Sequence, residues 1–252
     1  MTGKDRPTAP HPLLTDYYAR ASDRQEFVTA LFDGAAKHYD FVDGVLAFGS
    51  GPSYRRQSLA RAGLRRGMRL LDVATGTGQV ARAALGILGD PRAVVGVDPN
   101  GPMLAEARRR LPITLVRGTA EALPFASERF DFLSMGFALR HVADLEIAFA
   151  ECLRVLRPGG QVLLLEVTRP RSTAVRILVR LYLERVVPLV MRVTGRSGQA
   201  GLLMKYYWAT IAECVSAETI LAVMRESGFV DVDRKVFGGI LSEYVGRKPA
   251  RS

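Results

Sequence analysis

The residues best suited to chemistry lie in a glycine-rich loop that follows a short apolar run. Leu70 to Val73 has the pattern of a buried strand, and it runs through Ala74 to Gln79 into a segment with helical periodicity, Val80 to Leu88. A glycine-rich turn between strand and helix lets a ligand approach the backbone closely and meet free amide groups. The cofactor-binding residues that this loop predicts are Asp72, Gly76, Thr77 and Gly78.

The charge on this loop separates two classes of cofactor. Gly76, Gly78 and Ala81 also satisfy the G-x-G-x-x-A pattern, so a nicotinamide-dependent dehydrogenase is the competing interpretation. A carboxylate at Asp72 repels a pyrophosphate but attracts a cationic amino-acid group. S-adenosylmethionine carries such a group and no phosphate, so the loop favours it as the cofactor.

A second carboxylate follows the next apolar run. Asp98 ends the run Ala93 to Val97, at the usual position of a side chain that accepts hydrogen bonds from both ribose hydroxyls. The alternative is that Asp98 caps the following helix. Met103 has a spacing that lets it pack on adenine, although a core methionine fits equally well. After the third apolar run, the loop Gly118 to Phe125 can present backbone amides to the adenine edge.

The candidate catalytic residues are Arg140, His141 and Tyr39. Arg140 and His141 follow the fourth apolar run, at the edge of the sheet where the cofactor is expected. An arginine can stabilise a phenolate or orient a water, and a histidine has a pKa suited to general base catalysis. The alternative for His141 is a loop residue that caps a backbone group. Tyr39 and Asp40 are expected in a lid over the aromatic ring of the substrate, and simple packing is the alternative for Tyr39.

The elements that must position these residues alternate along the chain. From Arg69 onward, short β-rich runs are separated by segments with helical periodicity, which is typical of βαβ units and a parallel sheet. Near the C-terminus, two β-rich runs flank Gly238-Gly239 with no room for a crossover helix, so they predict an antiparallel hairpin. The predicted fold is α/β and Rossmann-like, with a seven-stranded, mainly parallel sheet that ends in this hairpin.

The remaining segments divide the chain as follows. We expect a disordered or loosely ordered tail at 1–24, an N-terminal helical cap at 25–62 with a turn at Gly49 to Pro52, and a catalytic domain at 63–252. A helical insertion at about 171–216 follows the fifth strand of that domain.

The first part of the insertion, 171–196, combines apolar surface with positive charge. Arg176, Arg180 and Glu184 share one helical face at i, i+4 spacing, and Pro188 should kink or end the first helix. Such a basic amphipathic segment suits a membrane surface that supplies a lipid-like substrate. The alternative is that its apolar residues pack on the sheet or form a homodimer interface. The arginines of this segment are Arg171, Arg176, Arg180, Arg185, Arg192 and Arg196.

The composition limits the class of protein, its partners and its location. The chain has 252 residues, 48% hydrophobic and 24% charged, without an uncharged apolar run of bilayer-spanning length, as in ordinary globular proteins. A net charge of +10 suggests nucleic acid, a membrane surface or an acidic substrate as partner. The polar stretch Met1 to Pro12 lacks the apolar core of a secretion signal, so we expect a cytoplasmic location, at most peripheral at the inner face of the membrane. Cys152 and Cys214 have no metal-ligand spacing, which favours buried thiols and no metal site.

Several of these segments together resemble class I methyltransferases, and most closely the ubiquinone/menaquinone C-methyltransferase family. The resemblance covers nearly the whole chain from Phe32, and it implies S-adenosylmethionine as the cofactor with Thr77, Asp98, Thr119, Ala120 and Gly136 in contact with it. The segments that carry it are FDGAAKHYD (32–40), LDVATGTGQ, VGVDPNGPML, GTAEALPF, FALRHVADL, LRVLRPGGQVLLLEVTRP, and the C-terminal ESGF, GGI and GRK.

Two positions depart from the family pattern. Thr119 stands where the family usually has Asp or Asn, which removes one partner for the adenine amino group. His141 stands where the quinone enzymes usually have Asn, and many methyltransferases of other small molecules have His there.

The function that the resemblance implies is C-methylation of a hydrophobic quinol, a polyprenyl phenol or a related aromatic metabolite. Methylation of a soluble natural product is the alternative, and the two departures also keep open a rhodoquinone-type amino transfer. A SAM-binding accessory protein without turnover is the non-enzymatic alternative. We expect no nucleic-acid substrate, because neither the Asn/Asp-Pro-Pro-aromatic signature nor a Pro-Cys nucleophile is present.

Overall fold

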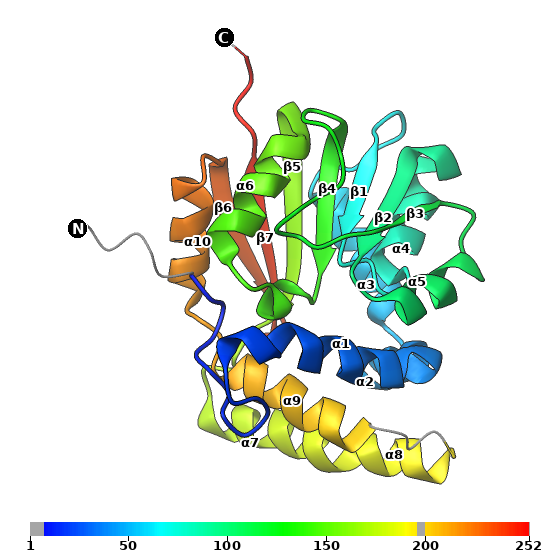
Figure 1. Ribbon diagram of the computed structural model, residues 1–252, viewed down its shortest axis with the longest axis vertical. Coiled ribbons are helices and arrows are strands. Elements are labelled where there is room, and N and C mark those ends of the chain that lie inside the picture. The colour runs from blue at the N-terminus through cyan, green and yellow to red at the C-terminus, as the bar shows by residue number, and fades with distance from the viewer. Residues whose placement is uncertain (1–7, 196–199, 252) are drawn as a thin grey trace.

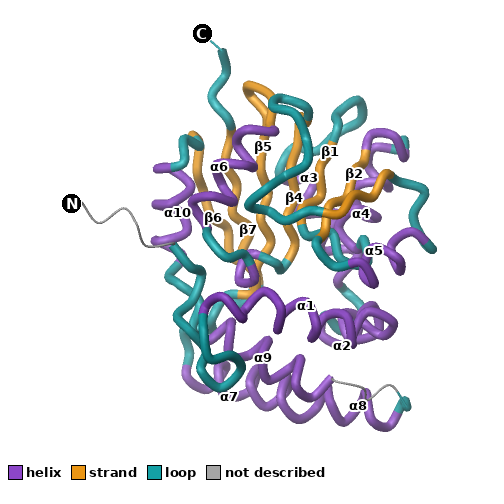
Figure 2. Tube along the Cα trace, viewed as in Figure 1, coloured by secondary structure: helices purple, strands orange, loops and turns teal. Residues whose placement is uncertain are grey.

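The computed structural model describes residues 8–195 and 200–251, and its centre is a seven-stranded sheet of order β3-β2-β1-β4-β5-β7-β6 (Figures 1 and 2). The first five strands are parallel, and β7 is antiparallel to both β5 and β6. The predicted sheet and its C-terminal hairpin are therefore confirmed. The strands are β1 (Leu70–Val73), β2 (Val94–Asp98), β3 (Thr114–Arg117), β4 (Phe130–Gly136), β5 (Leu156–Val167), β6 (Val230–Phe237) and β7 (Leu241–Arg247).

Helices cover both faces of this sheet because successive strand residues point to opposite sides. Leu70 packs with α3 (Gly51–Arg61) and α4 (Gln79–Leu88), and Leu71 packs in a second cluster with α6 (Leu145–Val155) and α10 (Ala217–Glu226). A further helix, α5 (Gly101–Arg108), contacts β2 and β3. The chain order reverses at β1, between β2 and β4, and parallel sheets bind ligands at the carboxyl ends of strands beside such a reversal.

A separate layer of helices lies below these carboxyl ends (Figure 1). It combines two N-terminal helices with the insertion after β5, and both predicted features of the fold are confirmed. Leu31 and Val42 from the first group share one buried cluster with Val187, Leu203 and Tyr206 from the second. The helices of the layer are α1 (Arg24–Ala35), α2 (Tyr39–Leu46), α7 (Thr173–Leu181), α8 (Val187–Val193) and α9 (Ala200–Ala212).

The expected cap at 25–62 is divided between these two parts of the molecule. α1 and α2 belong to the helical layer, but α3 packs on α4 beside the sheet, because Leu59 and Ala62 lie in the same cluster as Ala81 and Ala84. The turn between α2 and α3 has Gly49 with φ of 73°, a left-handed conformation that glycine adopts without strain.

Pro188 changes the type of helix rather than ending it. α7 stops at Leu181, and a π-helical turn, Tyr182–Val186, connects it to α8, where Pro188 lies in the first turn. A proline cannot donate to the carbonyl four residues earlier, and a π turn, with its i to i+5 bonds, accommodates the missing donor. The segment therefore continues as one helical rod from Thr173 to Val193.

The structure differs from the expected loose tail over residues 8–24. The backbone oxygens of Thr8 and Pro10 accept hydrogen bonds from the amides of Leu145 (3.0 Å) and Val215 (2.8 Å), and Leu14 and Tyr18 are buried in the helical layer. The reason is that the first amides of a helix such as α6 lack partners within the helix, so an extended segment can bind them. Residues 1–7 of the predicted tail lie outside the described residues.

Over the described residues, no helix is long and apolar enough to cross a membrane. Both cysteines are free, with Cys152 buried and Cys214 partly exposed, and burial raises the pKa of both thiols to about 12.

Candidate active site

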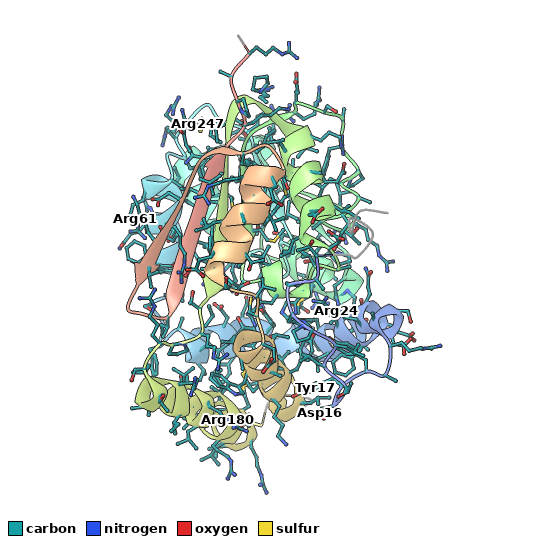
Figure 3. All side chains as sticks on the ribbon, turned by 90° about the vertical axis from the view of Figure 1, so that its left-hand side faces the viewer. Asp16, Tyr17, Arg24, Arg61, Arg180 and Arg247 are labelled. Carbon is teal, nitrogen blue, oxygen red and sulfur yellow. The ribbon has the colours of Figure 1, made fainter. Side chains whose placement is uncertain are left out.

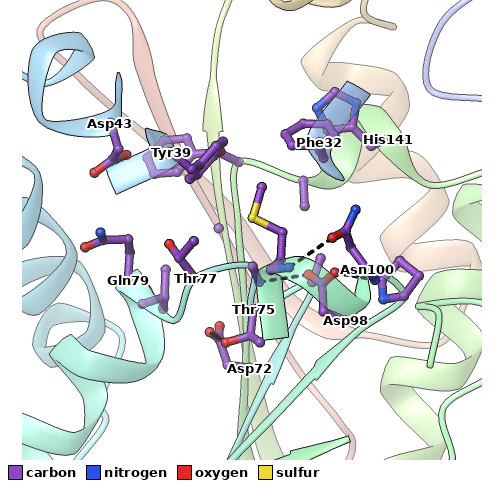
Figure 4. Close-up of a pocket in the computed structure, with 18 of the residues that line it drawn as sticks. Phe32, Tyr39, Asp43, Asp72, Thr75, Thr77, Gln79, Asp98, Asn100 and His141 are labelled. Carbon is purple, nitrogen blue, oxygen red and sulfur yellow. Dashed lines mark hydrogen bonds between the residues drawn. The ribbon is translucent and has the colours of Figure 1, made fainter. Parts of the chain in front are cut away.

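A pocket lies where the carboxyl ends of β1, β2 and β4 meet α1, α2 and α9 (Figure 4). The sheet contributes loop residues and carboxylates to its floor, and the helical layer contributes mainly aromatic and apolar side chains to its roof. Of the residues predicted from the sequence, those that line it are Tyr39, Asp72, Gly76, Thr77, Asp98, Met103, Gly136 and His141. Gly78, Thr119, Ala120 and Arg140 do not line it.

The glycine-rich loop turns sharply beneath this pocket. Gly76 and Gly78 have φ of 56° and 85°, in the left-handed region that favours glycine. A Cβ added to Gly78 would lie 2.4 Å from Cδ1 of Leu111, so that glycine permits close packing of α4 rather than contact with a ligand. Gly136 plays a similar part for β4, because an added Cβ would lie 2.5 Å from Cγ2 of Val80.

Asp72 is buried at the end of β1 and held by three donors. Its Oδ1 accepts from the Ser134 hydroxyl (2.7 Å), and its Oδ2 accepts from the Thr75 hydroxyl (2.6 Å) and the Ala81 amide (3.2 Å). Burial raises the pKa of Asp72 to about 6, and these hydrogen bonds limit the rise. The result is a fixed carboxylate on the pocket floor, and no cation in the described part of the chain is paired with it.

Asp98 is placed in the same way at the end of β2. Its Oδ2 accepts from the Gly76 amide and its Oδ1 from the Asn100 amide, both at 2.8 Å, and burial raises its pKa to about 6. The helix-cap role considered for Asp98 belongs to Asn100, whose Oδ1 accepts from the Met103 amide at 3.0 Å at the start of α5. Asp98 is thus free to face a ligand.

The helical layer is attached to the glycine-rich loop through α2, which carries the two residues expected in a lid. The Thr77 hydroxyl donates to Asp40 at 2.5 Å, and Asp40 also forms an ion pair with Arg110, just beyond α5. Tyr39 and Phe32 pack together above the loop, with ring centroids 5.9 Å apart. Burial raises the pKa of Tyr39, so its side chain remains a phenol.

His141 faces the pocket with both ring nitrogens unpaired. Its ring contacts Phe32 edge to face (centroids 5.2 Å apart) and stacks on Tyr206 (5.7 Å). Neither nitrogen has a hydrogen-bond partner within the described structure, so the backbone-capping alternative is not observed. Burial, followed by the positive charges of Arg140 and Arg24, lowers the pKa of His141 well below its usual value. The imidazole is therefore neutral at physiological pH.

Arg140 does not point into the pocket, although the sequence suggested that it would. Its side chain is fully buried, with Nε donating to Glu166 (2.8 Å) and Nη1 to the Thr210 hydroxyl (2.7 Å), and its guanidinium lies 4.3 Å from the centroid of the Tyr207 ring. It points toward β5 and α9 rather than into the pocket. The cause is Glu166, a buried carboxylate on β5 with which the guanidinium forms an ion pair.

The loop with Thr119 and Ala120 also lies outside the pocket. The two residues belong to a short turn closed by a bridge from Thr119 to Ala122, and Ala120 is buried in the sheet core. Several residues that line the pocket were not predicted from the sequence. Asn100 has a recognisable signal, because it directly precedes a helix. Arg55 and Tyr207 have none, because helical periodicity does not show which face of a helix meets the pocket. The missed residues include Phe32, Asp43, Arg55, Thr75, Gln79, Asn100 and Tyr207.

The chemistry of this pocket fits a cationic nucleoside. Asp72 and Asp98 are buried and form no ion pair with any described residue, so together they attract a positive ligand, whereas a pyrophosphate would be repelled. The strand order and site together define a class I S-adenosylmethionine-dependent methyltransferase, and solved structures share the fold. One is a possible histamine N-methyltransferase from Thermotoga maritima, with a TM-score of 0.61 and 23% identity over 87% of this chain and 98% of that one. Another is a putative methyltransferase from Methanococcus maripaludis, with a TM-score of 0.62 and 16% identity over 87% and 94%.

Sequence comparison gives the particular family. The family model of ubiE/COQ5 methyltransferases matches residues 19–248. The ubiquinone/menaquinone biosynthesis C-methyltransferase of Shewanella halifaxensis is 31% identical over 90% of this chain and 93% of its own, and that of Francisella tularensis subsp. novicida is 30% identical over 90% and 92%. The chain belongs to the ubiE/COQ5 methyltransferase family and is an S-adenosylmethionine-dependent enzyme.

Proposed function

We propose that this enzyme methylates a ring carbon of a hydrophobic quinol or polyprenyl phenol. The observation that carries the proposal is the contrast within the pocket: the carboxylates lie on its floor, and the opposite wall is aromatic and apolar around a neutral histidine. This wall suits a flat aromatic ring with an apolar tail. It is formed by Val28, Phe32, Tyr39, Leu46, Phe137, Ala138 and Tyr207.

The floor residues are assigned to the cofactor. Asp98 would accept hydrogen bonds from the ribose hydroxyls, Asp72 would attract the amino group, and Met103, which lines the same pocket, would pack on the adenine. When bound, S-adenosylmethionine supplies a methyl group activated by the sulfonium. The chain's own task is to align the acceptor with that group and exclude water, and such positioning can contribute about 7–11 kcal/mol.

His141 is assigned to the acceptor. A ring carbon becomes nucleophilic when an ortho or para hydroxyl loses its proton, and the unpaired, neutral imidazole of His141 can accept that proton. Arg140 acts indirectly as a positioning residue, because its ion pair with Glu166 fixes the short turn, Leu139–His141, that carries the histidine. Its charge also keeps the imidazole neutral.

The test compares acceptors with the purified enzyme and deuteriomethyl-labelled cofactor. We expect labelled methyl on a ring carbon of demethylated quinols with isoprenoid tails, and His141→Gln should lower kcat by about 100-fold while leaving the Kd for S-adenosylhomocysteine unchanged. Mass spectrometry of lipid quinones from a deletion strain should show the unmethylated precursor. Transfer to oxygen, or turnover only with water-soluble phenols, would contradict the proposal.

The same proposal includes attachment of the helical layer to an anionic membrane surface. The rod formed by α7, the π turn and α8 exposes one apolar face, beside Phe48, which is 80% exposed and stacks on Tyr182. Arg180 lies on this layer, apart from Arg61 and Arg247 beside the sheet (Figure 3). Arg196, also predicted for this surface, lies outside the described residues. The exposed apolar side chains of the rod are Val175, Ile177, Leu178, Leu181, Val186, Leu189 and Val193.

A further inference from the structure

Arg55 brings a buried, incompletely paired guanidinium to the pocket. The side chain extends from α3, is 3% exposed and lines the pocket. Its Nη2 donates to Asp43 of α2, but its Nε and Nη1 have no hydrogen-bond partner among residues 8–195 and 200–251. A Cβ at Gly51 would lie 2.5 Å from Nη1, so the glycine leaves room for the guanidinium one turn away.

These two free donors call for an anionic ligand. A buried donor without a partner costs free energy, and a guanidinium N–H donates a strong, charge-assisted hydrogen bond to a carboxylate oxygen. Among the residues that line the pocket, all within the described chain, Arg55 is the only lysine or arginine, against Asp43, Asp72 and Asp98. A ligand with one carboxylate and otherwise positive charge would pair with both the arginine and the aspartates of this pocket.

The position of Arg55 indicates at which end of the pocket an anionic group would bind. Its guanidinium lies 5.3 Å from the centroid of the Phe137 ring, directly after β4, and β4 pairs with β1 so that Ser134 lies opposite Asp72. Asp98 lies on the other side of β1, at the end of β2. A cofactor with its ribose at Asp98, as proposed above, extends its amino-acid group across β1 toward Asp72 and Arg55.

We propose that Arg55 binds the α-carboxylate of S-adenosylmethionine and that Asp43 holds the guanidinium in place. The ammonium and carboxylate share one carbon atom, so Asp72 and Arg55 form a complementary pair for the two groups. Because α3 packs beside the sheet and α2 belongs to the lid, the Asp43–Arg55 ion pair also links cofactor binding to the position of the lid.

The test uses calorimetry with two ligands and no acceptor. S-adenosylhomocysteine contains the carboxylate, and its decarboxylated analogue lacks only that group. We expect the wild type to prefer S-adenosylhomocysteine, and Arg55→Met should reduce affinity for it by about 10- to 100-fold while changing affinity for the analogue by less than about threefold. Arg56→Met removes the same charge from the exposed neighbouring residue and should change neither affinity.

Arg55→Lys keeps the positive charge without the planar guanidinium and should reduce the preference for the carboxylate only in part, so it serves if the methionine variant fails to fold. Equal losses for the two ligands, or an unchanged preference in either Arg55 variant, would overturn the proposal. A raised KM for the acceptor with unchanged binding of both ligands would assign Arg55 to the acceptor instead. Because no acceptor is present in the binding experiment, failure of the quinol proposal leaves this result unaffected.

Discussion

Asp72 and Asp98 control how the pocket responds to pH. Both carboxyls have a pKa of about 6, because burial opposes ionisation more strongly than the donors around them favour it. A surface aspartate would remain ionised down to pH 4, but in the free enzyme these two take up protons as the pH falls from about 7 to 5. Their protonated forms cannot attract an ammonium group or accept a full set of hydrogen bonds.

We therefore expect affinity for S-adenosylhomocysteine to be constant above about pH 7 and to fall as the pH drops through 6, because a ligand that requires the ionised carboxyls must displace their protons. Calorimetric titration between pH 5 and 8 measures this. Asp98→Asn should reduce affinity at pH 8 by about 1.5–3 kcal/mol and make the pH profile shallower. A profile that stays flat down to pH 5 would contradict the assignment.

Arg140 and Glu166 form a fully buried ion pair, which makes Arg140 important for stability. Arg140→Met would leave the carboxylate of Glu166 buried without a paired cation, so the free energy of unfolding should fall by about 3–5 kcal/mol. Urea unfolding measures this change, and the double variant with Glu166→Gln should recover part of it. A variant of Arg140 with unchanged stability and greatly reduced kcat would instead show that it acts on the acceptor.

At the scale of elements, the rod formed by α7, the π turn and α8 leads to a prediction about membrane binding. Each arginine near an anionic bilayer contributes about 1 kcal/mol, so Arg176→Gln, Arg180→Gln and Arg185→Gln together should greatly reduce co-sedimentation with anionic vesicles at low salt. Neutral vesicles should bind the wild type weakly.

The matched control neutralises three exposed arginines on the sheet side, Arg82, Arg92 and Arg108, which changes the net charge equally. If this control loses as much vesicle binding as the triple variant of the rod, the attraction comes from overall charge and not from the rod. If the wild type binds no vesicles and forms a dimer that Leu178→Glu disrupts, the exposed apolar face is a homodimer interface.

At the scale of the whole molecule, residues 8–23 connect the helical layer with the sheet side. They bind backbone amides at the start of α6 and before α10, and they bury Leu14 and Tyr18 among the helices. Leu14→Ala should lower the free energy of unfolding by about 2–4 kcal/mol, whereas the same change at Leu13, which is 43% exposed, should cost less than about 0.5 kcal/mol. Equal small effects in urea unfolding would show that this segment contributes little to stability.

The sequence by itself determined the sheet, its C-terminal hairpin and the cofactor loop, because these depend on local signals. Alternation of β-rich and helical segments sets a parallel sheet, and glycines mark where the backbone needs positive φ. Asp72 and Asp98 were found for the same reason: each ends a strand, and the ends of parallel strands meet at one edge.

The tertiary structure alone decided which side chains complete the pocket. Arg140 lies next to His141 in the sequence, yet the two point apart because a buried carboxylate on β5 attracts one of them. Arg55 and Tyr207 come from the helices α3 and α9, and helical periodicity does not show which face of a helix meets a cavity built by several separate segments. Side-chain direction is fixed by packing between elements, and packing has no local signal in the sequence.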